Sequence, residues 1–149
     1  MTWWRSPIRR LLSQNEESRV IAAIRAAESQ TAGELRVHVE RRCAGDPMAA
    51  ANHWFRRLGM EKTKDRSGIL FYVAVADRRF AIVGDAGIHE KVGDEFWRRL
   101  RDAMQEEFVK GDAATGLCRA IDEAGTLLAK HFPRQPEDRN ELPDEISYR

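Results

Sequence analysis

The stretch ILFYVAVA at residues 69–76 is apolar at every position. A strand with one face in water alternates apolar and polar residues, so an unbroken apolar run predicts a central strand that is covered on both faces. The residues ADRR that follow can turn the chain tightly into RFAIVG at 79–84. The two segments therefore predict an antiparallel hairpin inside a sheet with helices on both faces.

The first helix and the first strand of the expected fold lie before this run. NEESRVIAAIRAAES at 15–29 places its apolar residues at helical spacing, with Asn15 as the expected N-cap. ELRVHVE at 34–40 alternates apolar and polar residues. This alternation predicts a strand with one wetter face.

Three further helices complete the expected set of elements. Their predicted ranges are 46–59, which begins with Asp46 and Pro47, then 92–108, and last 112–132, which stops before Pro133. The order is helix, strand, helix, strand, strand, helix, helix. It predicts a single compact α/β domain with a small mixed sheet between helices, in which a right-handed crossover makes the first two strands parallel neighbours.

The length of 149 residues suits one domain. We divide the chain into an N-terminal Trp/Arg segment at 1–14, an α/β domain at 15–132 and a tail at 133–149. The tail is rich in proline and charge. It is expected to be loosely ordered or to run as a strap over the surface.

Composition excludes several classes of function. The 25 Lys and Arg residues nearly balance the 24 Asp and Glu residues, and a net charge of +1 gives no basic surface for nucleic acid. Cys43 and Cys118 lie far apart with no metal-ligand spacing, so we expect free thiols and no zinc site. The N-terminal apolar run is too short for a signal peptide or a membrane span, which predicts a cytoplasmic protein without a transmembrane segment.

The N-terminal segment combines Trp3 and Trp4 with Arg5, and such a combination can lie at a membrane surface. The segment is short for that role. We favour tryptophans that dock onto the domain or onto a second subunit, and we leave the oligomeric state and the identity of a protein partner open.

Acidic residues are expected to meet at one rim of the sheet. Glu34 begins the first strand, Asp65 precedes the second, and Asp85 follows the third. With the first two strands parallel and the third antiparallel to the second, these residues lie at the same rim, and Asp94 at the start of the next helix could join them. We call these four residues the acidic rim.

Clustered carboxylates repel one another unless a cation compensates them, and oxygen ligands suit Ca²⁺ or Mg²⁺. The acidic rim therefore predicts a divalent metal site. Two alternatives stay open. The carboxylates could cap turns and a helix or sit in water, or Arg134 or Arg139 of the tail could form ion pairs with them.

Familiar catalytic motifs are absent from the sequence. HEKVG at 89–93 lacks the second histidine of a zinc-protease motif, and no GxGxxG, GK[ST] or GxSxG occurs. His89 lies close to the acidic residues and could assist a proton transfer. A surface histidine at the start of a helix is the preferred interpretation.

Three segments resemble the TPM-domain family: TAGELRVHVE, KTKDRSGILFYVAVADRRFAIVGDAGIHEKVGDEFW and GLCRAIDEAGTLLAKHFP. The likeness covers residues 16–132. It implies a compact α/β domain with a mixed sheet between helices, a calcium-binding acidic rim as in some members, and the acid phosphatase activity proposed for relatives in the thylakoid lumen. The matching acidic positions are Glu34, Asp65 and Asp85, whereas Asp94 follows only from the rim argument.

Two functions follow as hypotheses. The first is a binding or accessory module whose acidic rim takes Ca²⁺ or, where calcium is scarce, Mg²⁺. The alternative is a metal-assisted phosphatase that acts on phosphate monoesters, with Asp85 as a metal ligand and base and Arg66 steadying the phosphate.

Overall fold

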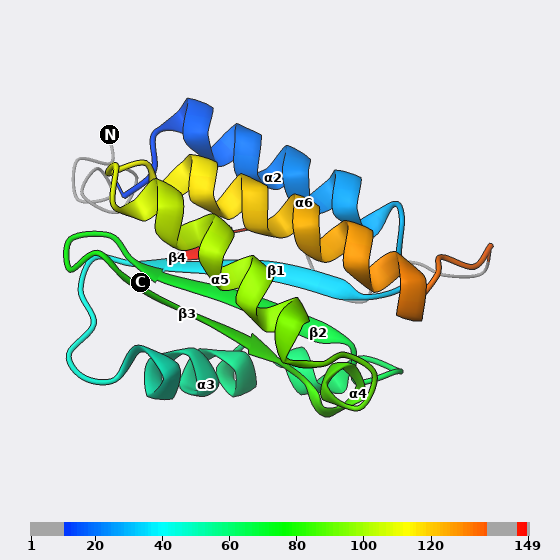
Figure 1. Ribbon diagram of the computed structural model, residues 1–149. Helices are drawn as coiled ribbons and strands as arrows, with labels where there is room; N and C mark the ends of the chain where they lie inside the picture. The colour runs from blue at the N-terminus through cyan, green and yellow to red at the C-terminus, as the bar shows by residue number, and fades with distance from the viewer. Residues whose placement is uncertain (1–10, 137–145, 149) are drawn as a thin grey trace, which may run out of the picture.

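The computed structural model describes residues 11–136 and 146–148. A sheet lies in the middle, with α2, α5 and α6 over one face and α3 over the other (Figure 1). The helices are α2 (Gln14–Glu28), α3 (Pro47–Arg57), η2 (Met60–Lys62, a 3₁₀ turn), α4 (Ala86–His89), α5 (Asp94–Phe108) and α6 (Ala113–His131). The strands are β1 (Glu34–Glu40), β2 (Gly68–Ala74), β3 (Arg79–Gly84) and β4 (Ile146–Tyr148).

The sheet is mixed, with the strand order β3-β2-β1-β4. β1 and β2 are parallel, with Glu34 opposite Gly68, and β2 and β3 are antiparallel, with Ile69 opposite Gly84. Both pairings and the α/β architecture confirm the prediction. The short α4 between β3 and α5, and the strand β4, were not predicted.

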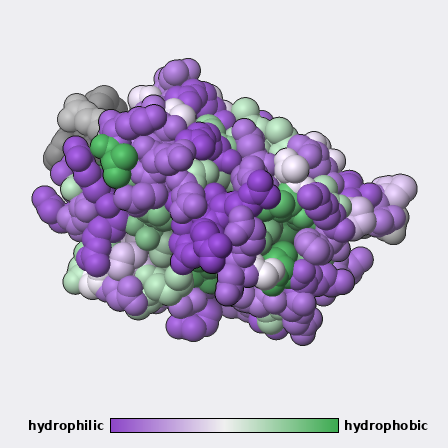
Figure 2. Space-filling model, viewed as in Figure 1, coloured by the Kyte–Doolittle hydropathy of each residue, from purple (hydrophilic) through white to green (hydrophobic). Residues whose placement is uncertain are grey.

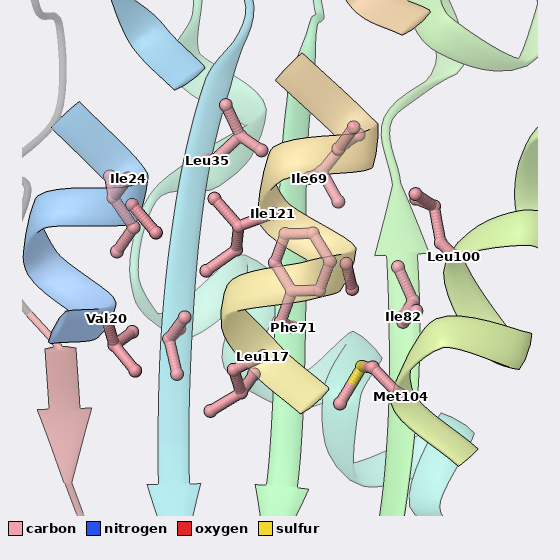
Figure 3. Packing of buried hydrophobic residues seen from close by; sticks show 14 of the residues in the cluster. Val20, Ile24, Leu35, Ile69, Phe71, Ile82, Leu100, Met104, Leu117 and Ile121 are labelled. Carbon is pink, nitrogen blue, oxygen red and sulfur yellow. The ribbon is translucent and has the colours of Figure 1, made fainter. Parts of the chain in front are cut away.

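Residues 69–74 of the apolar run lie in β2 and are buried, whereas Val75 and Ala76 lie past the end of the strand. Ile69 and Phe71 face the main core, where α2, α5 and α6 pack on the sheet (Figure 3). Leu70 and Tyr72 face α3 in two smaller clusters. The central, doubly covered strand is therefore confirmed.

β1 differs from the expectation of one wetter face, because α3 covers that face. The His38 ring stacks on Trp54 with 4.1 Å between ring centroids. Glu40 accepts a hydrogen bond from Nε1 of Trp54 at 3.1 Å and another from the hydroxyl of Tyr72. His38 and Glu40 of β1 thus join Trp54 and Tyr72 in a network of side-chain contacts in place of a solvated face.

The start of α2 also differs from the expectation. Ser13, not Asn15, is the N-cap, and its hydroxyl accepts from the Glu16 amide at 3.1 Å while the Glu16 carboxylate accepts from the Ser13 amide at 2.8 Å. This reciprocal pair is a capping box, which satisfies two amides at once and outcompetes a single asparagine cap.

Residues 146–148 form a strap along the edge of β1, as β4, with Val37 opposite Ile146. Ser147 Oγ lies 2.7 Å from His38 Nδ1, and the Tyr148 hydroxyl donates to Glu17 at 2.6 Å. Arg139 of the tail and the segment that carries Trp3, Trp4 and Arg5 lie outside the described residues. In the part of the chain that the structure describes, no helix is long and apolar enough to cross a bilayer.

Candidate functional site

The main chain brings three acidic segments to one rim of the sheet. The Glu34 amide donates to the Ser67 carbonyl at 3.1 Å, and the Asp85 amide donates to the Gly68 carbonyl at 3.0 Å. The start of β1, the turn before β2 and the end of β3 therefore meet at this rim.

Asp85 is held by Arg66 in a two-point ion pair. Nε of Arg66 donates to Oδ2 of Asp85 at 2.8 Å, and Nη2 donates to Oδ1 at 2.9 Å. The Asp85 side chain is 5% exposed, whereas that of Arg66 is 53% exposed. The hydrogen bonds to Asp85 and its charge raise the pKa of the Arg66 guanidinium.

Asp85 also caps the short helix α4, because its Oδ1 accepts from the Ala86 amide at 2.7 Å. Both carboxylate oxygens are therefore occupied by donors of the chain itself. Two-point contacts of this kind fix the orientation of both groups.

Gly87 lets α4 pack against the turn that carries Arg66. A Cβ built on Gly87 would lie 2.1 Å from the Asp65 carbonyl oxygen and 2.6 Å from that of Arg66. The absence of a side chain at Gly87 therefore permits the close approach that places Asp85 beside Arg66.

The other acidic residues of the rim have different surroundings. Glu34 is buried, at 4% exposure. Asp65 is exposed in a pocket of about 320 Å³ that Lys64, Lys91 and Glu90 also line. Asp94 is exposed at the start of α5 and lines a different pocket. Among the described residues, no three His, Cys, Asp or Glu side chains form a group that could hold a metal ion.

That second pocket, of about 660 Å³, follows strand β3, and we call it the β3 groove. Its central lining comes from Phe80–Gly84 of β3, from Met48 and Asn52 of α3 and from Trp97, Arg98 and Arg101 of α5. In the orientation of Figure 1, the surface mixes hydrophobic patches with hydrophilic residues (Figure 2). The sequence did not predict this groove. The spacing of Trp97, Arg98 and Arg101 places the three side chains on one side of α5, which was the available signal.

The family model of the TPM domain matches residues 9–127. This chain belongs to the TPM-domain family. A comparison of this TPM domain with curated proteins finds no match.

Solved structures share the fold of this TPM domain. The BA42 protein of the psychrophilic bacterium Bizionia argentinensis is 44% identical, with a TM-score of 0.87, over 92% of this chain and 94% of BA42. The N-terminal domain of a protein from P. gingivalis is 21% identical, with a TM-score of 0.67, over 84% of this chain and 82% of that one. The N-terminal domain of cg2496 from Corynebacterium glutamicum is 14% identical, with a TM-score of 0.61, over 91% and 79%. The last two similarities show the fold alone.

The cysteines and His89 are the other candidate reactive side chains, and the structure places each of them in ordinary surroundings. Cys43 is buried and Cys118 half-buried, both are free thiols, and burial raises the pKa of Cys118. His89 is exposed at the end of α4, with its ring centroid 5.0 Å from that of Trp97. It is thus a surface histidine, although it is the last residue of α4 and does not begin a helix.

The cluster of Ser147, His38 and Glu40 has the residue types of a nucleophile, a base and an orienting carboxylate. His38 is fully buried, however, and the Ser147 hydroxyl donates to the Val37 carbonyl at 3.2 Å. A substrate has no access to His38 in this position. The cluster holds β4 on β1.

Proposed function

We propose that this TPM domain acts as an accessory binding module and not as a hydrolase. The observation that carries the proposal is the engagement of Asp85. Both of its oxygens accept hydrogen bonds from Arg66, and one of them also accepts from the Ala86 amide. These three donors take three of the roughly four lone-pair sites of the carboxylate, and Arg66 already balances its charge, which leaves Asp85 poorly placed to act as a catalytic base or metal ligand.

The competing function is a metal-assisted phosphatase that uses Asp85 and Arg66. Arg66 would then have to release Asp85 before it could steady a phosphate, and Asp85 would lose its counterion in a position with 5% exposure. Separation of a buried carboxylate from its donors costs free energy that substrate binding would have to offset. This cost disfavours the phosphatase mechanism.

Hydrolysis of a chromogenic phosphate monoester in the presence of Mg²⁺ or Ca²⁺ tests this choice. We expect no activity that persists through repurification. The matched variants are Asp85→Asn and Asp102→Asn, since Asp102 is an exposed carboxylate on α5. Activity that survives repurification, collapses in Asp85→Asn and persists in Asp102→Asn would overturn the proposal.

A divalent cation at the acidic rim is a second proposal, supported by the meeting of the Glu34, Asp65 and Asp85 segments at one rim. The four predicted carboxylates do not fit a cation as a set in this arrangement, because Asp94 lines a different pocket and Arg66 occupies Asp85. A cation would have to compete with the Arg66 guanidinium.

Calorimetric titration of Ca²⁺, then Mg²⁺, into chelator-stripped protein tests cation binding. We expect saturable binding that is lost in Asp85→Asn and becomes tighter in Arg66→Gln, because the second variant removes the competing charge. Binding that is unchanged in both variants would place any cation elsewhere. Absence of binding in all three proteins would end the cation proposal.

A further inference from the structure

β3 is an edge strand, and its outer side carries main-chain groups in a regular row. The Asp85 amide bonds to the Gly68 carbonyl, so in the antiparallel register Val83 and Ala81 also direct their main-chain groups toward β2. The alternate residues Phe80, Ile82 and Gly84 then direct theirs outward. No described residue forms a hydrogen bond with these outward main-chain groups.

This open edge lines the β3 groove, whose walls come from α3 and α5. In Figure 1, β3 lies between these two helices. An edge strand ordinarily carries proline, a bulge or inward charge that prevents pairing with another chain. The segment FAIVG at 80–84 has none of these residue types. A groove with helical walls admits a single extended strand, whereas a second sheet edge with its own flanking helices would collide with the walls.

The two walls differ in chemistry. The α5 wall presents Arg98 and Arg101, and Arg98 pairs with Glu95 at 3.0 Å. No acidic side chain among the described residues pairs with Arg101. A carboxylate that enters the groove on this side would therefore find a cation without a partner.

The α3 wall combines the apolar Met48 with the polar Asn52. Met48 is 44% exposed there, beside Ala81 and Val83 of β3. The groove also contains two aspartates at helix N-termini, where the helix dipole favours negative charge. Asp46 is the N-cap of α3, and Asp94 is the first residue of α5. Asp46 already accepts from the Met48 amide at 3.2 Å.

We propose that the β3 groove binds an extended peptide segment of a partner protein, which pairs with β3 as an added strand. Because successive side chains of a strand point to opposite faces, acidic residues of the peptide lie toward Arg98 and Arg101 and the alternate, apolar residues lie toward Met48. This inference rests on the proposed role as a binding module and names its surface and the class of its partner.

NMR on the full chain tests the inference with an acetylated and amidated peptide of alternating glutamate and valine. Expected are chemical-shift changes centred on the amides of Phe80, Ile82 and Gly84, with slower hydrogen exchange at the same amides. The same peptide with every amide N-methylated should not bind, because neither edge of it keeps donors for pairing. Equal binding of the methylated peptide, shifts centred elsewhere, or no shifts would each overturn the proposal.

Charge-reversal variants test the preference of the β3 groove for an acidic peptide. Arg101→Glu is expected to weaken peptide binding about five- to tenfold, since it replaces attraction by repulsion at an exposed site. Lys130→Glu, an exposed reversal on α6 away from the groove, should leave binding unchanged. Equal weakening in both variants, or equal binding of a lysine–valine peptide, would contradict the proposal.

Amide hydrogen exchange of the free protein shows whether something other than a partner peptide already pairs with the edge of β3. Outward amides that are already protected in the free protein would overturn the proposal. Protection that grows with protein concentration would assign the edge to a second copy, and protection independent of concentration would assign it to a segment of the same chain. Failure of these tests leaves the noncatalytic role intact, because that role fails only on hydrolysis tied to Asp85.

Discussion

Arg66 has a left-handed backbone, with φ of 51°, and its side chain holds Asp85. A left-handed backbone is unfavourable for a residue with a Cβ, so the surrounding contacts must impose it. One of those contacts is the packing of Gly87 against the carbonyls of Asp65 and Arg66. The position of Asp85 thus depends on a glycine two residues along the chain.

Gly87→Ala should therefore destabilise the protein. The added methyl would sit 2.1 Å from a main-chain oxygen, and overpacking against backbone costs about 1–3 kcal/mol. Urea denaturation measures the loss. Gly45→Ala is the control, because a Cβ at Gly45 meets nothing within 4 Å. Equal stability of the two variants would show that the contact at Gly87 relaxes without cost.

Arg78 is the other described non-glycine residue with positive φ, at 53°, in the turn between β2 and β3. The left-handed conformation costs an L-residue about 1–2 kcal/mol, and the greater unfolded-state entropy of glycine offsets about 0.5–1 kcal/mol of the gain. Arg78→Gly should thus stabilise the protein by about 0.5–1 kcal/mol in urea denaturation. Arg79→Gly, in regular strand conformation, should do the reverse, and a loss of stability in both variants would contradict this account.

At the scale of elements, α6 depends on the cap at its start. Asp112 Oδ1 accepts from the Thr115 amide at 3.1 Å, and Oδ2 accepts from the Thr115 hydroxyl at 2.8 Å. Loss of such a cap costs about 1 kcal/mol, which thermal denaturation of Asp112→Ala measures.

The same cap predicts a dependence on pH. The hydrogen bond from the Thr115 side chain is the main cause that lowers the pKa of Asp112. A lowered folded-state pKa contributes stability above the unfolded value of about 4, and this contribution is lost as pH falls through the folded value. The stability difference between wild type and Asp112→Ala should therefore shrink in acid. A difference that stays constant into acid would contradict the assignment.

β4 is held on the sheet by its side chains. Tyr148→Phe removes the hydrogen bond to Glu17 and should cost about 1 kcal/mol, visible as faster amide exchange in β4. Burial first, and then the bond to Glu17, raise the pKa of Tyr148. The contribution of the neutral hydroxyl is present below the unfolded pKa of about 10 and is lost as pH rises through the folded value. Exchange in β4 that is unaffected by the substitution would show that Ile146 and Ser147 suffice.

At the scale of the whole molecule, removal of residues 146–149 uncovers the edge of β1 beside Val37–Val39 and the core next to Ile146. An uncovered edge strand is a template for pairing between chains. The truncated protein should therefore sediment faster than the full chain at equal concentration, in sedimentation velocity. Equal sedimentation would show that the edge of β1 does not pair when it is uncovered.

The sequence predicted the elements whose signals are local. The run at 69–76 and the periodicity of α6 are examples, and the placement of three acidic segments at one rim followed from strand direction alone. β4 was missed because three residues carry too little pattern, and its pairing with β1 is a contact across more than a hundred positions of the chain. The sequence left open whether Asp94 joins the rim; in the structure the unpredicted α4 precedes it, and Asp94 lines the β3 groove.

The two edges of the sheet differ in a way that bears on assembly. β4 closes one edge, and the groove leaves the other edge open within the described part of the chain. In the language of polymerisation, such a sheet has a valence of one for strand addition. Growth of a fibril needs two reactive ends on each unit. A unit with a single reactive end accepts one strand and terminates the chain.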